Sequence, residues 1–242
     1  MTLIATEFRK LRTVRSPWLL LLAAQAVVAV GVAGPLATAA AGQEHEMVST
    51  AAAHLGLASL LPLVLGITAV AGEYRHRTIT DTYLGNPRRG RVLLAKILVY
   101  TVAGLAFGLV GTATVLLATT IFLGGTAGWI GDGELWRTLV GAIVWNAAFA
   151  TVGVAIGALV RNLATAIATA LVWVALVETA VGQLVGGEVA KWLPFTAGSA
   201  LGRLPTAVDG GLGQWSAAAV LFAYATVLAG LALTAGARRD VG

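Results

Sequence analysis

The chain has 242 residues, of which 58% are hydrophobic and only 11% are charged, and its mean hydropathy is +0.86. Soluble domains are usually about half apolar, so this composition excludes a soluble globular protein. The formal net charge of +5 could suit a nucleic-acid binder, but the basic residues lie on short segments between long apolar runs, which excludes that class. The sequence contains no cysteine, which excludes disulfides and thiolate metal sites.

Six apolar runs are long enough to cross a membrane, for which about 20 residues are needed. They cover residues 17–37, 52–72, 92–123, 138–160, 163–182 and 214–236. The first run is too long for the core of a cleavable signal peptide, so we expect it to remain as a span. Because the six runs leave little chain for a water-soluble part, the predicted fold is an all-α integral membrane protein with one domain over residues 1–242.

Residues 1–16 precede the first span and have an amphipathic pattern. Apolar positions recur every three or four residues at Ile4, Phe8, Leu11 and Val14, while the charged positions lie off this stripe at Glu7, Arg9, Lys10 and Arg12. Such a pattern predicts a helix that lies along the membrane surface, and Pro17 then begins the first span.

An acidic triplet, Glu44-His45-Glu46, follows the first span, and His54 comes soon after it. These residue types can bind a metal, but a short acidic segment on a loop is usually only solvated. We therefore predict no metal site.

The segment from Glu73 to Arg91 carries seven formally charged residues in nineteen, between two apolar spans. Thr78–Leu84 can form a short helix, with Thr78 as the N-cap and Asp81 as the acidic partner of a capping box. Gly85-Asn86-Pro87 would end this helix, because proline lacks an amide proton and disfavours helix in the preceding residue. A short helix between charged flanks is typical of a docking element. The alternative is that the arginines only anchor anionic lipids.

Among the polar residues inside predicted spans, three are candidates for a substrate path or gate: Gln25 in the first, Asn146 in the fourth and Glu178 in the fifth. Polar groups in lipid mark substrate paths or gates, and amides there more often form interhelical hydrogen bonds. Glu178 is a candidate for a contact in a substrate path. The alternative is a structural carboxylate that pairs with loop amides or with an arginine such as Arg203.

Residues 183–213 are apolar but interrupted by glycine and proline. This segment is too broken for a crossing, so we expect short helices that enter the outer leaflet as a lid.

The basic residues orient the chain. With both termini in the cytoplasm, thirteen of the sixteen lysines and arginines face inward: Arg9, Lys10, Arg12, Arg15, Arg75, Arg77, Arg88, Arg89, Arg91, Lys96, Arg161, Arg238 and Arg239. This distribution obeys the positive-inside rule. It predicts a cytoplasmic 73–91 loop and a tight cytoplasmic turn at Arg161-Asn162.

Several segments resemble the bacterial type-2 ABC transporter permease family. The start, Thr6-Glu-Phe-Arg-Lys-Leu-Arg-Thr-Val-Arg-Ser-Pro-Trp18, is similar to the start of that family. The spacing of Glu73, Arg75 and Thr78, and then of Pro87, Arg91 and Lys96, resembles its signature around the second and third spans. The stretches Val177-Glu-Thr179 and Lys191-Trp-Leu-Pro194 are similar to the end of its fifth span and the loop that follows. Arg77 departs from the family, in which many members have glycine before the threonine.

The resemblance implies a transmembrane subunit of an exporter in the bacterial cytoplasmic (inner) membrane. Two permease copies, identical or homologous, would work with two copies of a separate ABC ATPase, which would bind ATP and Mg²⁺. The 73–91 segment would be a coupling loop whose helix docks on that ATPase, and the N-terminal helix would brace it. The expected coupling or positioning residues are Glu73, Arg75, Thr78, Asp81, Pro87, Arg88, Arg89, Arg91 and Lys96. The cargo would be a hydrophobic or amphipathic drug, antibiotic, peptide or lipid.

The residues themselves agree with a non-catalytic membrane subunit. None of the three lysines follows the glycine of a phosphate-binding loop, and neither a catalytic residue nor a cofactor is predicted in this chain. Membrane lipids and the ATPase are the expected partners. A secondary carrier that works without an ATPase remains an alternative, although it would need ion-coupling acids in mid-membrane. A membrane scaffold is the third possibility.

Overall fold

The computed structural model describes residues 3–37, 44–86, 88–123, 131–205 and 211–238. All regular secondary structure in these ranges is helical. In chain order the elements are α1 (Leu3–Thr13), α2 (Arg15–Ala37), α3 (Glu44–Ala53), the 3₁₀ helix η1 (His54–Ser59), α4 (Leu60–Arg75), α5 (Ile79–Gly85), α6 (Arg89–Leu123), α7 (Gly133–Val160), α8 (Leu163–Val172), the π-helix η2 (Trp173–Val177), α9 (Glu178–Leu184), α10 (Gly187–Ala190), α11 (Pro194–Leu201) and α12 (Gln214–Arg238).

Six helical segments are long and apolar enough to cross a membrane, which confirms the predicted fold class. They are Arg15–Ala37, Met47–Arg75, Arg89–Leu123, Gly133–Val160, Leu163–Leu184 and Gln214–Gly236. The second segment includes the turn η1, and the fifth includes the π-helix η2. These interruptions stay within helical geometry, as lipid requires, because unpaired backbone groups are costly there.

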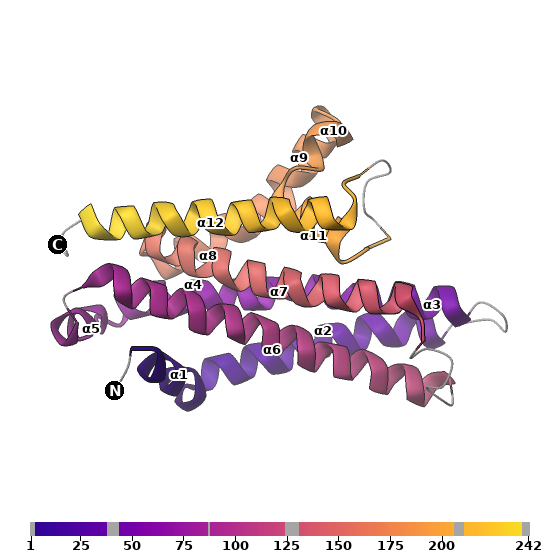
Figure 1. The fold of residues 1–242 in the computed structure, drawn as a ribbon, viewed down its shortest axis with the longest axis horizontal. Helices are drawn as coiled ribbons and strands as arrows, with labels where there is room; N and C mark the ends of the chain where they lie inside the picture. Colours follow the sequence, from indigo (N-terminus) through magenta and orange to yellow (C-terminus); the bar gives the residue numbers. More distant parts are fainter. Residues whose placement is uncertain (1–2, 38–43, 87, 124–130, 206–210, 239–242) are drawn as a thin grey trace.

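The long helices lie side by side in one bundle, as Figure 1 shows, and α7 packs against α4, α6 and α12. Glycine allows α4 and α7 to cross at close range. A Cβ atom on Gly66 of α4 would lie 2.2 Å from the carbonyl oxygen of Ala150, and one on Gly153 of α7 would lie 2.1 Å from that of Leu63. The backbones of α4 and α7 therefore approach so closely that only glycine fits at these two positions, as is usual where helices pack in lipid.

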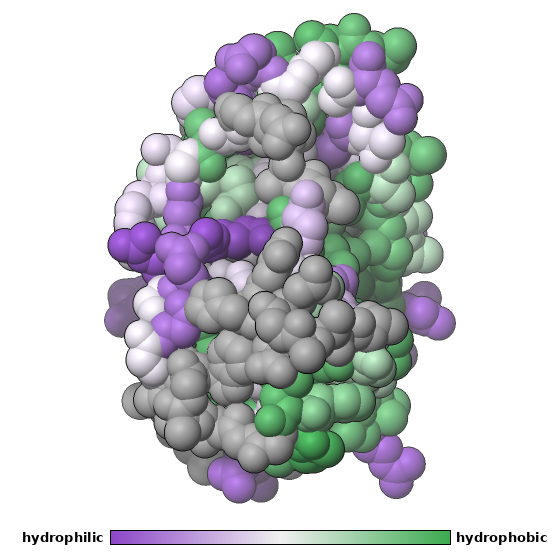
Figure 2. All heavy atoms as spheres, turned by 90° about the vertical axis from the view of Figure 1, so that its right-hand side faces the viewer, coloured by the Kyte–Doolittle hydropathy of each residue, from purple (hydrophilic) through white to green (hydrophobic). Residues whose placement is uncertain are grey.

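The two ends of the bundle carry different short elements (Figure 1). α1 and α5 lie at one end, together with the last turns of α12. α3 and α11 lie toward the opposite end, and α9 and α10 lean away from the bundle beyond η2. Figure 2 views that opposite end and shows hydrophobic residues along one flank and hydrophilic residues mostly on the other side. The first and last described residues therefore lie at the same end, as an even number of crossings requires.

The predicted side-chain cap of α5 is wrong. Thr78 is the N-cap residue, but its side chain makes no capping hydrogen bond, and its backbone is already in the helical region. The reason is the end of α4. Arg77 adopts a left-handed conformation with φ of 57°, and the amides of Arg77 and Thr78 donate to the carbonyl oxygens of Tyr74 and Glu73. This is a Schellman motif, so the chain enters α5 directly from the end of α4.

The end of α5 agrees with the sequence. α5 stops at Gly85, and Asn86 is extended, with φ of −151° and ψ of 98°, as expected for a residue before proline. Pro87 itself lies outside the described residues.

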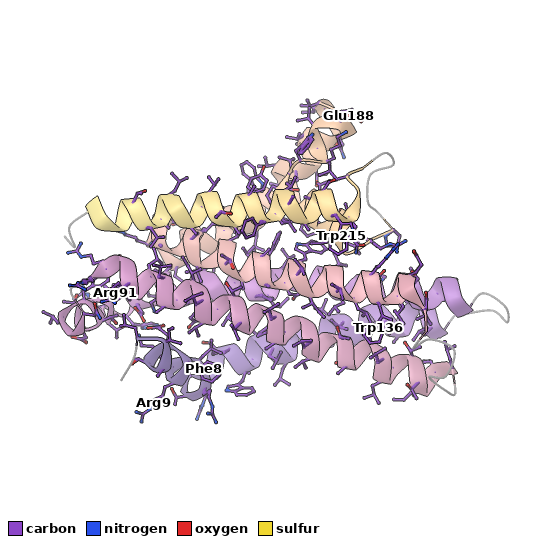
Figure 3. All side chains as sticks on the ribbon, in the orientation of Figure 1. Phe8, Arg9, Arg91, Trp136, Glu188 and Trp215 are labelled. Atoms are coloured by element: carbon purple, nitrogen blue, oxygen red, sulfur yellow. The ribbon has the colours of Figure 1, made fainter. Side chains whose placement is uncertain are left out.

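The position of Glu7 on α1 differs from the prediction. Glu7, assigned to the polar face, is 2% exposed, whereas Ile4 and Phe8 of the predicted apolar stripe are 49% and 48% exposed. Figure 3 shows Arg9 pointing away from the bundle. α1 therefore turns a carboxylate inward and leaves its largest apolar side chains on the outside of the protein.

Residues 183–205 form short helices, as expected. α11 is part of the packed bundle, however, and does not lie on its surface. Its residues Ala197, Gly198 and Leu201 are buried, and the helix packs against α7 and α12. Residues 206–210 lie outside the described residues.

Candidate functional site

A buried lysine lies at the α5 end of the bundle. Lys96, in the second turn of α6, is 1% exposed. Its Nζ donates to Glu7 Oε2 at 2.8 Å, to Glu73 Oε1 at 2.7 Å and to the carbonyl oxygen of Ala69 at 3.0 Å. An ammonium group has three donors, and all three are used here. The structure thus brings Glu73 and Lys96 together, both of which the sequence predicted as positioning residues.

A second lysine completes the network. Lys10 of α1 donates to Glu7 Oε1 and to Glu73 Oε1, both at 2.7 Å. Burial alone would lower the pKa of Lys10, but the hydrogen bonds and charges of Glu7 and Glu73 outweigh that effect and hold the pKa above its usual value. We call these four residues the lysine–glutamate network. It joins α1, the last turn of α4 and the start of α6.

The network balances two carboxylates with two ammonium groups in a site that is largely closed to water. Burying an unpaired charge is costly, whereas breaking a buried pair by removing one partner typically costs about 3–5 kcal/mol. Lys96 and Glu7 are both almost fully buried, with side-chain exposures of 2% and 3%. The position of α1 against the bundle is therefore tied to the charge state of these groups.

A cleft of about 660 Å³ adjoins the network. It is lined by Lys10, Glu73, His76, Asp81 and Tyr100 among others. The second carboxylate oxygen of Glu73 is buried and makes no hydrogen bond to the described residues. The cleft lies beside α1, the end of α4 and the start of α5.

The predicted arginines do not converge on one point. Arg75, Arg88 and Arg91 are exposed, and Figure 3 labels Arg91 at the α5 end of the bundle. The Arg89 guanidinium lies over the ring of Tyr83, with its Cζ 5.3 Å from the ring centroid. Thr78 and Asp81 are also exposed. The arginines therefore form charged flanks around α5, as the sequence suggested.

Glu178 has a structural set of partners. Its two carboxylate oxygens accept hydrogen bonds from the amides of Phe195 and Thr196 at 2.9 and 2.8 Å and from the Thr196 hydroxyl at 3.0 Å. The carboxylate thus caps the N-terminus of α11, where unpaired amides favour a negative charge. These contacts match the alternative in which Glu178 is a structural carboxylate bound to backbone amides. The suggested arginine partner is wrong, because Arg203 pairs with Glu134.

The two amide side chains predicted as candidates, Gln25 and Asn146, make interhelical contacts. Gln25 Oε1 accepts from the Thr114 hydroxyl at 2.7 Å, while Gln25 Nε2 is buried without a partner among the described residues. Asn146 Nδ2 donates to the carbonyl oxygen of Ala142 at 2.8 Å and is 3.5 Å from that of Leu55. Neither residue lies beside the lysine–glutamate network, and their role in a substrate path stays a prediction.

No group of three or more potential metal ligands occurs among the residues that the structure describes. The side chains of Glu44, His45 and Glu46 lie outside that description, and His54 Nδ1 is 2.9 Å from the carbonyl oxygen of Thr50.

Sequence reasoning missed Glu7 and Lys10 as site residues. A signal for Glu7 was present: it is spaced four residues from both Leu3 and Leu11 and seven from Val14, so it shares a helix face with them. A carboxylate on such a face indicates a buried partner on another helix.

The chain is similar to a known family of proteins. A protein-family model described as "ABC-2 family transporter protein" matches residues 3–177. The match runs from α1 to the end of η2 and so includes α5 and the whole lysine–glutamate network. No curated protein matches the chain.

Proposed function

Because the chain belongs to the ABC-2 family of transporter proteins, we propose that it is the permease subunit of an ATP-driven exporter in a bacterial cytoplasmic membrane. A separate ABC ATPase would bind ATP and Mg²⁺ and would drive two permease copies. The exported molecule would be hydrophobic or amphipathic, such as a drug, an antibiotic, a peptide or a lipid.

The observation that carries the proposal is α5. This helix has seven residues, and lies outside the membrane-spanning segments. Leu84 is 80% exposed, and Asp81 is also exposed. A short helix outside the spans, with exposed polar and apolar side chains between charged flanks, offers both kinds of contact that protein interfaces use. α5 is therefore suited to dock on the ATPase.

The lysine–glutamate network supports the same role. Glu73 lies in the last turn of α4, six residues before α5 begins, and it binds lysines of α1 and α6. A force applied to α5 would thus reach three helices through short hydrogen bonds. In this proposal Glu73 and Lys96 position the docking helix and contact neither ATP nor cargo.

An ion-coupled carrier finds less support. Such carriers need ionisable groups that exchange ions within the membrane. Glu178 is the buried acid of the fifth span, and its oxygens are held by two amides and a hydroxyl of α11. This carboxylate serves the fold, which leaves it poorly placed for ion exchange.

The docking role can be tested by replacing Thr78–Leu84 with a Gly/Ser linker of equal length. We expect the ATPase to lose co-purification with the permease, while the permease still enters the membrane. The matched control replaces Gly187–Ala190, the four-residue helix α10, and should leave the complex intact. Survival of the complex after the α5 replacement would overturn the docking role.

Orientation and cargo need separate measurements. The natural chain has no cysteine, so single cysteines at Thr80 and Glu188 can be labelled selectively. We expect an impermeant maleimide to label Glu188→Cys in intact cells and Thr80→Cys only after the membrane is opened. The opposite result would reverse the topology.

Stimulation of ATP hydrolysis in reconstituted complexes by a panel of lipophilic drugs, peptides and lipids would then identify the cargo class.

A further inference from the structure

Two tyrosines and two arginines from four parts of the chain meet beside α5. Tyr74 is in α4, Tyr83 in α5, Arg89 begins α6, and Arg161 forms the turn between α7 and α8. The Cζ of Arg161 lies 5.3 Å from the ring centroid of Tyr74, and that of Arg89 lies 5.3 Å from the ring centroid of Tyr83. All four side chains line one small cavity. We call these residues the tyrosine–arginine cluster.

Arg161 occupies a backbone position that normally favours glycine or asparagine. Its φ is 58°, in the left-handed region, and it ends α7, with its amide donating to the carbonyl oxygen of Gly157. A bulky residue is uncommon there and is usually held by its surroundings. The contact of its guanidinium with Tyr74 supplies such a restraint.

The turn that contains Arg161 is short and closed. Asn162 follows directly, and its side-chain oxygen accepts from the amide of Thr165 at 3.0 Å, which caps α8. Only these two residues separate the end of α7 from the start of α8. Any displacement of Arg161 must therefore move the ends of the fourth and fifth spans together.

α5 has few attachments of its own. Ile79 is its one fully buried residue, and Tyr83 is partly buried, whereas Thr80, Asp81 and Leu84 are exposed. Ile79 and Tyr83 are four residues apart, so they lie on the same face of the helix. Tyr83 is thus on the face by which α5 packs against the bundle, and Thr82 beside it is also partly buried.

The cluster leaves no room for a ligand. The cavity that it lines has a volume of about 20 Å³, which is enough for one water molecule but too small for a phosphate or a lipid headgroup. The guanidinium groups are held by aromatic rings, an arrangement that favours arginine through its planar charge. The cluster therefore serves to connect structural elements.

We propose that the tyrosine–arginine cluster carries displacements of α5 to the α7–α8 turn, so that Tyr83 and Arg161 are positioning residues for transport. The cluster is a second route beside the lysine–glutamate network, because that network reaches α1 and α6 whereas Arg161 reaches the fourth and fifth spans. This assignment rests on the proposed docking role of α5. The connection itself is a property of the permease alone, so it can be tested separately.

The first experiment measures the connection in the isolated full-length permease in nanodiscs. Spin labels at Thr80→Cys in α5 and Ala164→Cys in α8, both exposed positions, report the distance between the two elements by double electron–electron resonance. We expect a narrow distribution for the otherwise unchanged chain. Tyr83→Leu and Arg161→Gly should each broaden it, Arg161→Lys should broaden it less, and Tyr83→Phe should show the contribution of the hydroxyl group alone.

A matched control separates the loss of the Arg161–Tyr74 contact from the added backbone freedom of a glycine. Arg203 is another left-handed arginine, with φ of 54°, and it pairs with Glu134 away from α5. Arg203→Gly should leave the Thr80–Ala164 distribution narrow. Distributions for Tyr83→Leu and Arg161→Gly that equal the unsubstituted one would overturn the proposal.

The second experiment measures the transmitted motion in the complex with the ATPase. Labels at Leu98→Cys on the exposed face of α6 and at Ala164→Cys report how far the α7–α8 turn moves when ATP and vanadate trap the ATPase. With Tyr83→Leu or Arg161→Gly, the shifted population should fall at least about fivefold, the low end for energetic coupling between sites. With Arg161→Gly, which lies outside the docking helix, co-purification and basal ATP hydrolysis should not change, which a general folding defect would not permit.

The two proposals fail in different ways. An unchanged vanadate-induced shift in both variants would reject the cluster as a route, even if the ATPase binds α5. Absence of the ATPase from the purified unsubstituted complex would reject the docking role, and the isolated-permease distances would still decide whether the cluster fixes α5 to the α7–α8 turn.

Discussion

Buried carboxylates lie near both ends of the bundle, and their charges are balanced by different means. Near α5, Glu7 and Glu73 bind the ammonium groups of Lys10 and Lys96. Near α11, Glu178 binds two backbone amides and a hydroxyl. The first site joins three helices through full charges, and the second holds the start of one short helix.

The difference indicates which kind of substitution destabilises each site most. A network of full charges is strongly destabilised when one partner is removed, because the remaining charge stays buried and unpaired. A carboxylate on a helix N-terminus needs correct geometry more than it needs a countercharge. We therefore expect the α5 end to respond mainly to changes of charge and the α11 end mainly to changes of shape.

The largest effect is expected from Lys96→Met. The substitution keeps much of the side-chain volume but leaves Glu7 and Glu73 with Lys10 alone, so unfolding free energy should fall by about 3–5 kcal/mol. Thermal unfolding of the purified protein, followed by size-exclusion chromatography, measures this loss. Adding Glu7→Gln should restore part of it. A loss no greater than that of Lys10→Met would contradict the central place of Lys96.

Glu178→Gln should have the next largest effect. Glutamine offers one acceptor oxygen, so the backbone amide of either Phe195 or Thr196 would face the NH₂ group of the glutamine, which is also a donor. The lost hydrogen bond should lower the free energy of unfolding by about 1.5–3 kcal/mol. Hydrogen exchange should accelerate across Pro194–Leu201 and remain unchanged in α5. Reduced export with normal protection of α11 would instead assign Glu178 to the substrate path.

Gly198→Ala tests the shape of the α11 end without changing any charge. A Cβ atom at this position would lie 2.1 Å from Cε2 of Trp145, whose side chain is fully buried. Overpacking of this kind costs about 1–3 kcal/mol, measured as a fall in the unfolding temperature. Gly230→Ala is the control and should be neutral or stabilising, since a Cβ atom there would meet nothing within 4 Å among the described residues.

The smallest effect concerns pH and Lys10. Its pKa is raised in the folded protein, so its contribution to stability is complete below the unfolded value of 10.5 and is lost as pH rises through the folded value. The group is partly exposed, which limits the contribution to less than about 1 kcal/mol. The stability difference between the natural chain and Lys10→Met should stay constant from neutral pH to about pH 10 and shrink above it. A difference that shrinks already below about pH 9 would contradict the raised pKa.

Much of the fold could be predicted because it depends on local composition. The six apolar runs, the tight turn at Arg161-Asn162 and the end of α5 at Gly85 all follow from the chemistry of adjacent residues. The start of α5 could not be predicted in the same way. The pattern at Thr78 and Asp81 favoured a side-chain cap, but the left-handed Arg77 closes α4 with a backbone motif that uses the same residues.

The candidate site was predicted in part. Glu73 and Lys96 were identified, and the structure joins them. Glu7 was assigned to a polar face although its spacing from Leu3 and Leu11 places it on an apolar one. Nothing near it in the sequence identifies Lys96, 89 residues away, as its partner. Tyr74, Tyr83 and Arg161 were missed for the same reason, since their contacts connect separate helices.

The sequence by itself determined that this membrane protein has six segments long and apolar enough to cross a bilayer, because lipid requires long apolar helices with internally paired backbones. It also determined where charged residues can lie between the spans. Only the tertiary structure decided which charges meet. Ion pairs and arginine–aromatic contacts need atoms within a few ångströms of each other, and helix packing sets those distances between residues that are far apart in the chain.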